Sequence, residues 1–181
     1  PAMSAITGYP VMADRTIREE EYYWIWQGRT GLSLYHPASE QISFASDFPN
    51  DTGKYHIIKC IEKCRTQPGI WAASGNACVV HLQHESMKMK CIQEIRIPDA
   101  CQVRVLHEDD QGNLWIGTEN AIYQYSISDG NMRRIHKDTG AINGIAISPD
   151  KAIYYKYTPS TKAKTILPSS YPPTIRYGLP H

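Results

Sequence analysis

The chain has 181 residues, of which 41% are hydrophobic and 20% are charged, the composition of an ordinary soluble globular domain. Its 19 lysine and arginine residues nearly balance its 18 aspartate and glutamate residues, so no summed charge draws it toward nucleic acid or an anionic membrane. No window approaches the roughly 18 apolar residues that a spanning helix needs, so we expect no membrane contact within this chain.

Residues 1–19 are expected to form an N-terminal lead-in. The acidic stretch Asp14–Tyr23, DRTIREEEYY, is typical of a solvated approach to a first strand. Beyond it, Gly, Pro, Asn and Asp interrupt the chain about every eight to twelve residues, which favours short strands joined by turns over helices. We therefore predict an all-β protein.

Four related segments follow the lead-in, and we predict one blade in each of the ranges 20–60, 61–100, 101–140 and 141–176. The second, PGIWAASGNACVVHL at Pro68–Leu82, aligns without a gap on Gly112–Ser126, which places Trp71 on Trp115 with an offset of 115 − 71 = 44 residues. The first contains WIWQGRTGLSLY and the fourth contains IAISPDKAIYYKY. Residues 177–181 are predicted to begin a further blade or a tail.

The third segment, around DDQGNLWIGTENAIYQYS, has the clearest internal pattern. It predicts four strands at Val103–His107, Leu114–Thr118, Ile122–Ser126 and Met132–His136, with the acidic residues and glycines between them forming turns. Four short antiparallel strands in about 45 residues are typical of a propeller blade. We predict a partial β-propeller of about four blades, each of four antiparallel strands.

A large aromatic residue on the second strand of each blade, tryptophan in the first three, is expected to pack between adjacent sheets, where it buries much apolar surface. Trp115 and Trp71 occupy equivalent positions on the second strand of their blades, and Trp24 and Trp26 flank that position in the first. A partial propeller leaves blade edges exposed, so self-association through those edges is a further expectation.

The five cysteines form no recognisable framework. An odd number cannot all pair within one chain, and the Cys60–Cys64 spacing has no second pair at a zinc-site distance. We expect these cysteines to be small buried side chains on strands. Their count is also compatible with a cytoplasmic location.

Candidate ligand-binding residues are those in the turn between strands two and three of each blade and in the connection to the next blade, because these segments meet at the same end of the ring and loops carry function on rigid scaffolds. They are Arg29, Thr30, Asn76, Gln102, Arg104, Glu119, Asn120 and Asn143. No catalytic constellation accompanies them: Ser74 and Ser148 lack the surroundings of a nucleophile elbow. We expect a binding module without a cofactor.

The segment Glu108–Tyr125 resembles the two-component regulator propeller repeat, whose pattern is an acidic residue, an aspartate, GNLWIGT and an aromatic strand, with Ala121 where that family has glycine. YGLPH at Tyr177–His181 resembles the segment that precedes such a repeat. The resemblance implies a periplasmic or other extracytoplasmic sensor region of a bacterial hybrid two-component protein, acting in signal transduction. It also implies an oligosaccharide or another small molecule as ligand.

A second resemblance leaves an enzymatic alternative open. NGIAISPDKAIYY at Asn143–Tyr155 is similar to a segment of the gluconolactonase and luciferin-regenerating family, which are metal-dependent lactone hydrolases. That resemblance implies Asn143 as a ligand of a divalent metal, but the family's other ligands would fall near Arg104 and Val105, which cannot supply the several oxygens that such a cation needs. A scaffold that only docks other proteins is the third alternative.

Overall fold

A computed structural model describes residues 14–28, 31–45, 57–75, 77–100, 102–137, 140–158 and 163–168. Its strands form four antiparallel sheets, in which strands adjacent in sequence pair with each other. The first contains β1 (Arg15–Glu19), β2 (Tyr22–Gln27), β3 (Gly31–His36) and β4 (Gln41–Phe44), and the second contains β5 (Ile58–Lys63), β6 (Ile70–Ser74), β7 (Cys78–Glu85) and β8 (Lys88–Arg96). A short 3-10 turn, η2 (Pro98–Ala100), precedes the third sheet of β9 (Val103–Glu108), β10 (Asn113–Thr118), β11 (Ala121–Ser126) and β12 (Met132–Lys137), and the fourth contains β13 (Ile142–Ile147), β14 (Ile153–Tyr157) and β15 (Ala163–Ile166).

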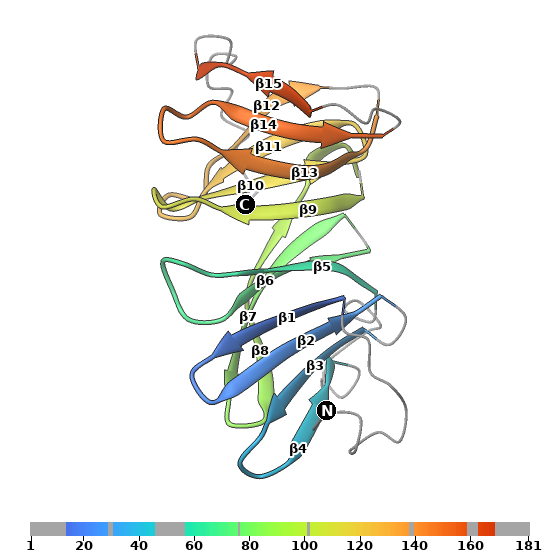
Figure 1. Ribbon diagram of the computed structural model, residues 1–181, viewed down its shortest axis with the longest axis vertical. Helices are drawn as coiled ribbons and strands as arrows, with labels where there is room; N and C mark the ends of the chain where they lie inside the picture. Colours follow the sequence, from blue (N-terminus) through green and yellow to red (C-terminus); the bar gives the residue numbers. More distant parts are fainter. Residues whose placement is uncertain are drawn as a thin grey trace, which may run out of the picture.

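The sheets follow one another as the blades of a β-propeller (Figure 1). The first strand of each blade lies innermost, since β9 contacts both β5 and β13. The first sheet lies at one end of the long axis and the fourth at the other, so the four blades form an open arc (Figure 1). The prediction of an all-β partial propeller with four blades is confirmed; the fourth strand predicted for the last blade, and residues 177–181, lie outside the described residues.

The third blade matches the strands predicted for it almost residue for residue. Leu114 to Gly117 of β10 pair with β9 on one side and β11 on the other, and Trp115 lies opposite His107 and Gln124. The turn between β9 and β10 is built on Asp109, whose carboxylate accepts hydrogen bonds from the backbone amides of Gln111 and Asn113, both at 2.9 Å. An aspartate that binds the amide two residues on is the expected chemistry of such a turn.

Each blade tryptophan is buried between its own sheet and the following one. Trp24 lies in a core cluster with residues of the second sheet, Trp71 in one with residues of the third, and Trp115 in one with Ile142 and Ile153 of the fourth. All three indoles are 2% exposed or less. The packing role expected for the tryptophans is thereby confirmed, and Trp24 is the residue that fills it in the first blade.

Every one of these indoles also donates a hydrogen bond to a carboxylate. The acceptors are Glu19 for Trp24 at 2.7 Å, Glu108 for Trp71 at 2.7 Å and Asp109 for Trp115 at 2.8 Å. A buried indole N–H needs an acceptor because it has lost its hydrogen bond to water. The acidic residues of the repeat therefore do more than form turns, which is all that the sequence predicted for them.

Two of these carboxylates hold the turn between β5 and β6 from both sides. Glu108, which is fully buried, accepts hydrogen bonds from the backbone amide and the hydroxyl of Thr66, at 2.9 and 2.7 Å. Glu19 of the first blade accepts one from the amide of Gly69 at 2.5 Å. These bonds connect the second blade to both of its neighbours, in addition to the apolar contacts.

Gly117 lies inside β10 and faces the next sheet, so its role differs from that of the turn glycines. A Cβ atom on this residue would come within 2.6 Å of Val105 and 2.8 Å of Ile142. Glycine is required here because two sheets approach too closely for a side chain, and not because of turn geometry.

The start of the chain and the cysteines differ in part from expectation. Residues 15–19, assigned to the lead-in, form β1, the innermost strand of the first blade, in which the apolar Ile17 is buried in the core. Cys64 and Cys78 are buried as expected, whereas Cys91 is exposed on β8. None of the four described cysteines forms a disulfide, and Cys101 lies outside the described residues.

In the part of the chain that the structure describes, no helix is long and apolar enough to cross a bilayer.

Candidate functional site

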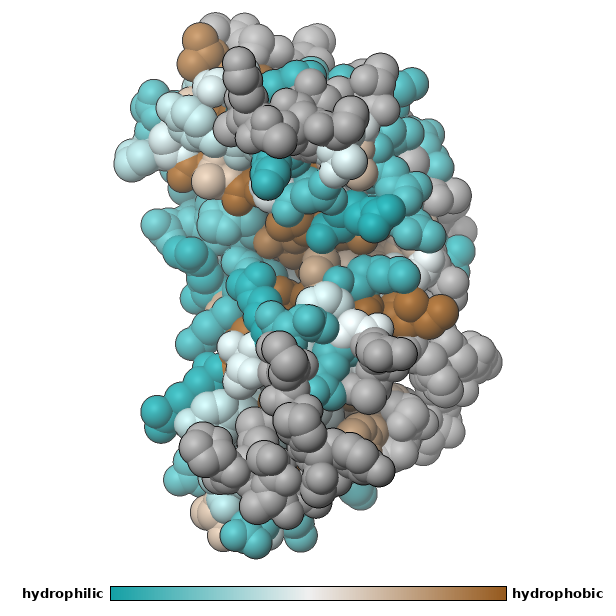
Figure 2. Space-filling view, turned by 45° about the vertical axis from the view of Figure 1, so that its right-hand side comes forward, coloured by the Kyte–Doolittle hydropathy of each residue, from teal (hydrophilic) through white to brown (hydrophobic). Residues whose placement is uncertain are grey.

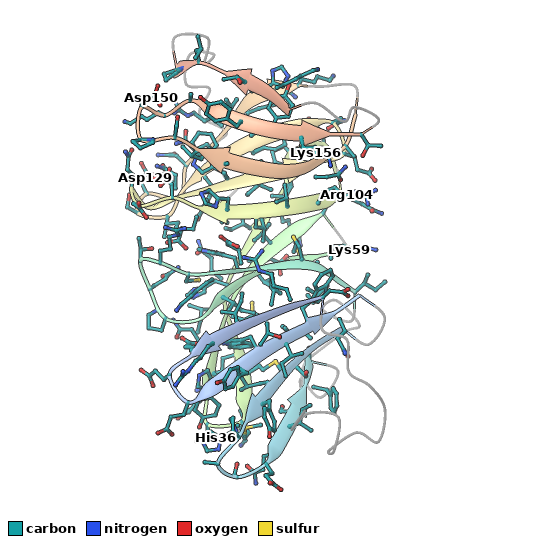
Figure 3. All side chains as sticks on the ribbon, in the orientation of Figure 1. His36, Lys59, Arg104, Asp129, Asp150 and Lys156 are labelled. Atoms are coloured by element: carbon teal, nitrogen blue, oxygen red, sulfur yellow. The ribbon has the colours of Figure 1, made fainter. Side chains whose placement is uncertain are left out.

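Five of the predicted ligand-binding residues lie in the described part of the chain, and they belong to one end of the arc. Gln102 and Arg104 lie at the start of β9, Glu119 and Asn120 in the turn from β10 to β11, and Asn143 near the start of β13. We call this the β10–β11 end. Figure 3 labels Arg104 at this end, on the right of the view. Arg29, Thr30 and Asn76 lie outside the described residues.

Three of the five are joined by direct contacts. The guanidinium of Arg104 forms an ion pair with the carboxylate of Glu119 at 2.9 Å, and the backbone amide of Glu119 donates to the carbonyl of Gln102 at 3.1 Å. Both charged side chains are close to half exposed. Arg104 and Glu119 therefore present a surface ion pair whose outer hydrogen-bonding capacity faces solvent.

Asn120 and Asn143 are positioned by neighbouring hydroxyl groups. The buried hydroxyl of Thr118 accepts hydrogen bonds from the backbone amides of Asn120 and Ala121, at 3.3 and 3.0 Å, which fixes the tip of the β10–β11 turn. The side-chain amide of Asn143 donates to the hydroxyl of Thr158. Among the described residues, no group of three or more His, Cys, Asp or Glu side chains is placed to hold a metal ion.

Figure 3 labels charged side chains at both ends of the arc. Lys59, Arg104 and Lys156 come from three different sheets and lie together on the β10–β11 end, whereas Asp129 and Asp150 lie on the opposite end (Figure 3). Figure 2 turns the β10–β11 end toward the viewer and shows hydrophilic side chains interleaved with smaller hydrophobic areas across the middle of the molecule. Such a mixed surface can offer hydrogen bonds and apolar contacts to the same ligand.

A polar chain along the innermost strands was not predicted from the sequence. The buried carboxylate of Glu62 on β5 pairs with Arg15 on β1 and lies 3.6 Å from the imidazole of His107 on β9. The three residues come from three successive blades at intervals of 62 − 15 = 47 and 107 − 62 = 45 positions. These intervals match the repeat period, so a comparison of equivalent positions for complementary charges could have found the chain.

A pocket of about 330 Å³ lies between the third and fourth blades, at the end opposite the predicted residues. Its walls come from the β5–β6, β9–β10 and β13–β14 turns together with β10, β11 and β12. The ionisable side chains that line it are Arg65, His107, Asp109, Asp110, Arg133 and Lys151. Sequence reasoning missed this pocket because its turns come from three different blades, and the sequence pattern does not show that they meet.

The four successive antiparallel sheets define a β-propeller. Among known protein families, the two-component regulator propeller matches residues 97–120. The chain therefore carries a repeat of this family, as its sequence indicated. Comparison with curated proteins gives no match.

Solved structures share the fold at low sequence identity. The extracellular domain of BT4673 from B. thetaiotaomicron, assigned as a hybrid two-component system, superimposes with a TM-score of 0.71 at 17% identity over 95% of this chain and 23% of that one. The corresponding domain of BT3049 from the same organism gives 0.62 at 13% identity, over 93% of this chain and 22% of that one. Virginiamycin B lyase from Staphylococcus aureus gives 0.64 at 15% identity, over 86% and 52%. The chain thus spans less than a quarter of the length of the two-component domains that it resembles.

Proposed function

We propose that this chain is part of the extracytoplasmic sensor region of a two-component signalling protein, and that it binds an oligosaccharide or a similar small ligand. The observation that carries the proposal is the regulator-propeller repeat at residues 97–120. The likeness of the whole arc to the extracellular domains of two such systems supports it.

The ligand is proposed to bind at the β10–β11 end. Arg104 on β9 and Glu119 in the β10–β11 turn offer both donors and acceptors for hydroxyl groups, and an ion pair holds them together. The neighbouring Asn120 and Asn143 add amide groups at the same end. A sugar presents many hydroxyls in fixed positions, so several modest hydrogen bonds from different blades can add up to useful affinity.

A thermal-shift screen of the chain against an oligosaccharide library, followed by calorimetric titration of the hits, tests the proposal. We expect at least one oligosaccharide to raise the Tm, and the Arg104→Ala variant to bind it about tenfold more weakly. Lys90→Ala is the matched control, because Lys90 forms an exposed ion pair with Glu85 on the β7–β8 hairpin, away from this end. Equal losses in both variants would contradict binding at the β10–β11 end.

Assays of metal binding and of lactone hydrolysis separate the sensor from the lactonase alternative. If Asn143 held a divalent metal, Ca²⁺ or Zn²⁺ should bind stoichiometrically and support hydrolysis of a lactone, and both effects should disappear in Asn143→Ala. Binding of an oligosaccharide in the presence of a chelator, without lactone hydrolysis, is the result that we expect. If neither ligand nor metal binds, a protein-docking role becomes the better explanation.

A further inference from the structure

The pocket between the third and fourth blades has the features of a second binding site, separate from the β10–β11 end. It lies among turns of three different blades, with Arg65 from the second, Asp109 from the third and Lys151 from the fourth. At about 330 Å³ it is in the lower part of the range of small-molecule sites. A monosaccharide or another molecule of similar size would fill it.

Three cationic side chains, Arg65, Arg133 and Lys151, and two carboxylates, Asp109 and Asp110, line this pocket. Both oxygens of Asp109 accept hydrogen bonds from its own turn and from the indole of Trp115. Asp110 is paired with Arg65 at 2.7 Å. Arg133 and Lys151 also line the pocket. The Nε of Arg133 donates to Gln124 at 2.6 Å, a bond that helps to orient its guanidinium.

Lys151 occupies a backbone conformation that normally favours glycine, with φ of 66°. The equivalent residue in the third blade is Gly112, with φ of 75°. The two turns share their hydrogen bonds: Asp109 N to Asn113 O and Gly112 N to Asp109 O in one, and Ser148 N to Ala152 O and Lys151 N to Ser148 O in the other. Lys151 therefore brings a cationic side chain to the wall of the pocket at a turn position where the third blade has glycine.

Neutral polar groups in the wall complement the cations. Gln111, Gln124 and Ser148 line the pocket together with the two carboxylates, and amide, hydroxyl and carboxylate oxygens all accept hydrogen bonds from hydroxyl groups. We propose that the pocket binds a small hydroxylated carboxylate, with the size and chemistry of a sugar acid. Its carboxylate pairs with Arg133 and Lys151, and its hydroxyls bind the neutral groups and the aspartates.

D-glucuronate is the probe, and D-glucose is its neutral counterpart because the two differ only by a carboxylate in place of a hydroxymethyl group. Calorimetric or NMR titration of the wild-type chain should show binding of glucuronate and at least tenfold weaker binding of glucose. Inorganic sulfate tests the cations alone and should also bind at least tenfold more weakly than glucuronate. Failure to bind glucuronate, or equal binding of glucose or sulfate, would overturn the proposal.

Two glycine substitutions separate ligand binding from folding. Lys151→Gly removes the ammonium group and relieves the backbone strain, so we expect a Tm no lower than that of the wild type and glucuronate affinity lower by at least tenfold. Ser86→Gly is the matched control, since Ser86 has φ of 52° in the β7–β8 turn, outside the pocket, and it should leave affinity unchanged. Unchanged affinity in Lys151→Gly would overturn the proposal. Arg104→Ala should not alter glucuronate binding, which distinguishes this site from the β10–β11 end.

Discussion

Asp109 has three roles in one side chain: it forms the β9–β10 turn, it accepts the indole N–H of Trp115, and it borders the inter-blade pocket. Burial alone would raise the pKa of its carboxyl group. The hydrogen bonds from Trp115, Asn113 and Gln111 outweigh that effect and hold the pKa below its ordinary value of 3.8. The ionised form is therefore favoured by folding.

Replacement of Asp109 by alanine should lower the free energy of unfolding at pH 7 by about 2 kcal/mol, because several donors lose a charged acceptor. Asp110→Ala should change it by less than about 0.5 kcal/mol, since Asp110 is exposed and only its surface pair with Arg65 is lost. Because folding lowers the pKa of Asp109, its contribution is complete above the unfolded value and declines as the pH falls below about 4. Urea denaturation of both variants at pH 7 and pH 3 measures this, and similar losses at the two pH values would contradict it.

At the scale of the blade, the packing of neighbouring sheets determines which side chains fit at their interface. At Gly117, Val105 of its own blade and Ile142 of the next lie within 3 Å of the place that a Cβ atom would occupy. The indole of Trp115 occupies the same interface, in a cluster with Ile142 and Ile153. The spacing of the third and fourth blades is therefore fixed by the large side chain of Trp115 and by the lack of a side chain at Gly117.

Gly117→Ala should destabilise the protein by about 2 kcal/mol, because the added methyl group must push apart two packed sheets. Gly144→Ala is the matched control on the neighbouring strand β13, where the nearest atom to an added Cβ is that of Lys156 at 3.8 Å. It should be neutral or slightly stabilising, since alanine restricts the unfolded chain. Chemical denaturation of the two variants gives the comparison, and equal effects would show that the sheets can separate without cost.

The whole molecule is an open arc. One face of its last sheet packs against the third blade, and the other face is turned away from it. Ile153 and Tyr155 of β14 point into the core shared with the third blade. Tyr154 and Lys156 point to the other side because side chains alternate along a strand, and Tyr154 is 45% exposed. The described residues place no further sheet on this face (Figure 1).

We expect the chain to self-associate through this face, as the open arc leaves an aromatic surface available to a second copy. Light scattering after size-exclusion chromatography should give a mass above 20.5 kDa that rises with concentration. Tyr154→Glu should restore the monomer, whereas Ile92→Lys, on the edge strand β8, should do so only if association occurs through blade edges. A monomer at all concentrations would contradict both routes.

The local pattern of the sequence was sufficient to predict the blades. Turn residues such as Asp109 and alternating strands such as Val103–His107 act over a few positions, and the repeat period of Trp71 and Trp115 showed that the unit recurs. The same pattern placed Arg104, Glu119 and Asn120 at one end, since strand direction alternates within each blade. The contacts of the structure agree with that grouping, and its binding role stays a prediction.

Tertiary structure alone decided how one blade meets the next. The hydrogen bonds that Thr66 donates to the carboxylate of Glu108, and the pocket that includes Lys151, join residues about one repeat or more apart. Sequence patterns encode which side chains share a face of one sheet, because backbone geometry fixes that locally. They do not encode the distance and angle between sheets, which depend on how tryptophans, glycines and branched side chains pack together in three dimensions.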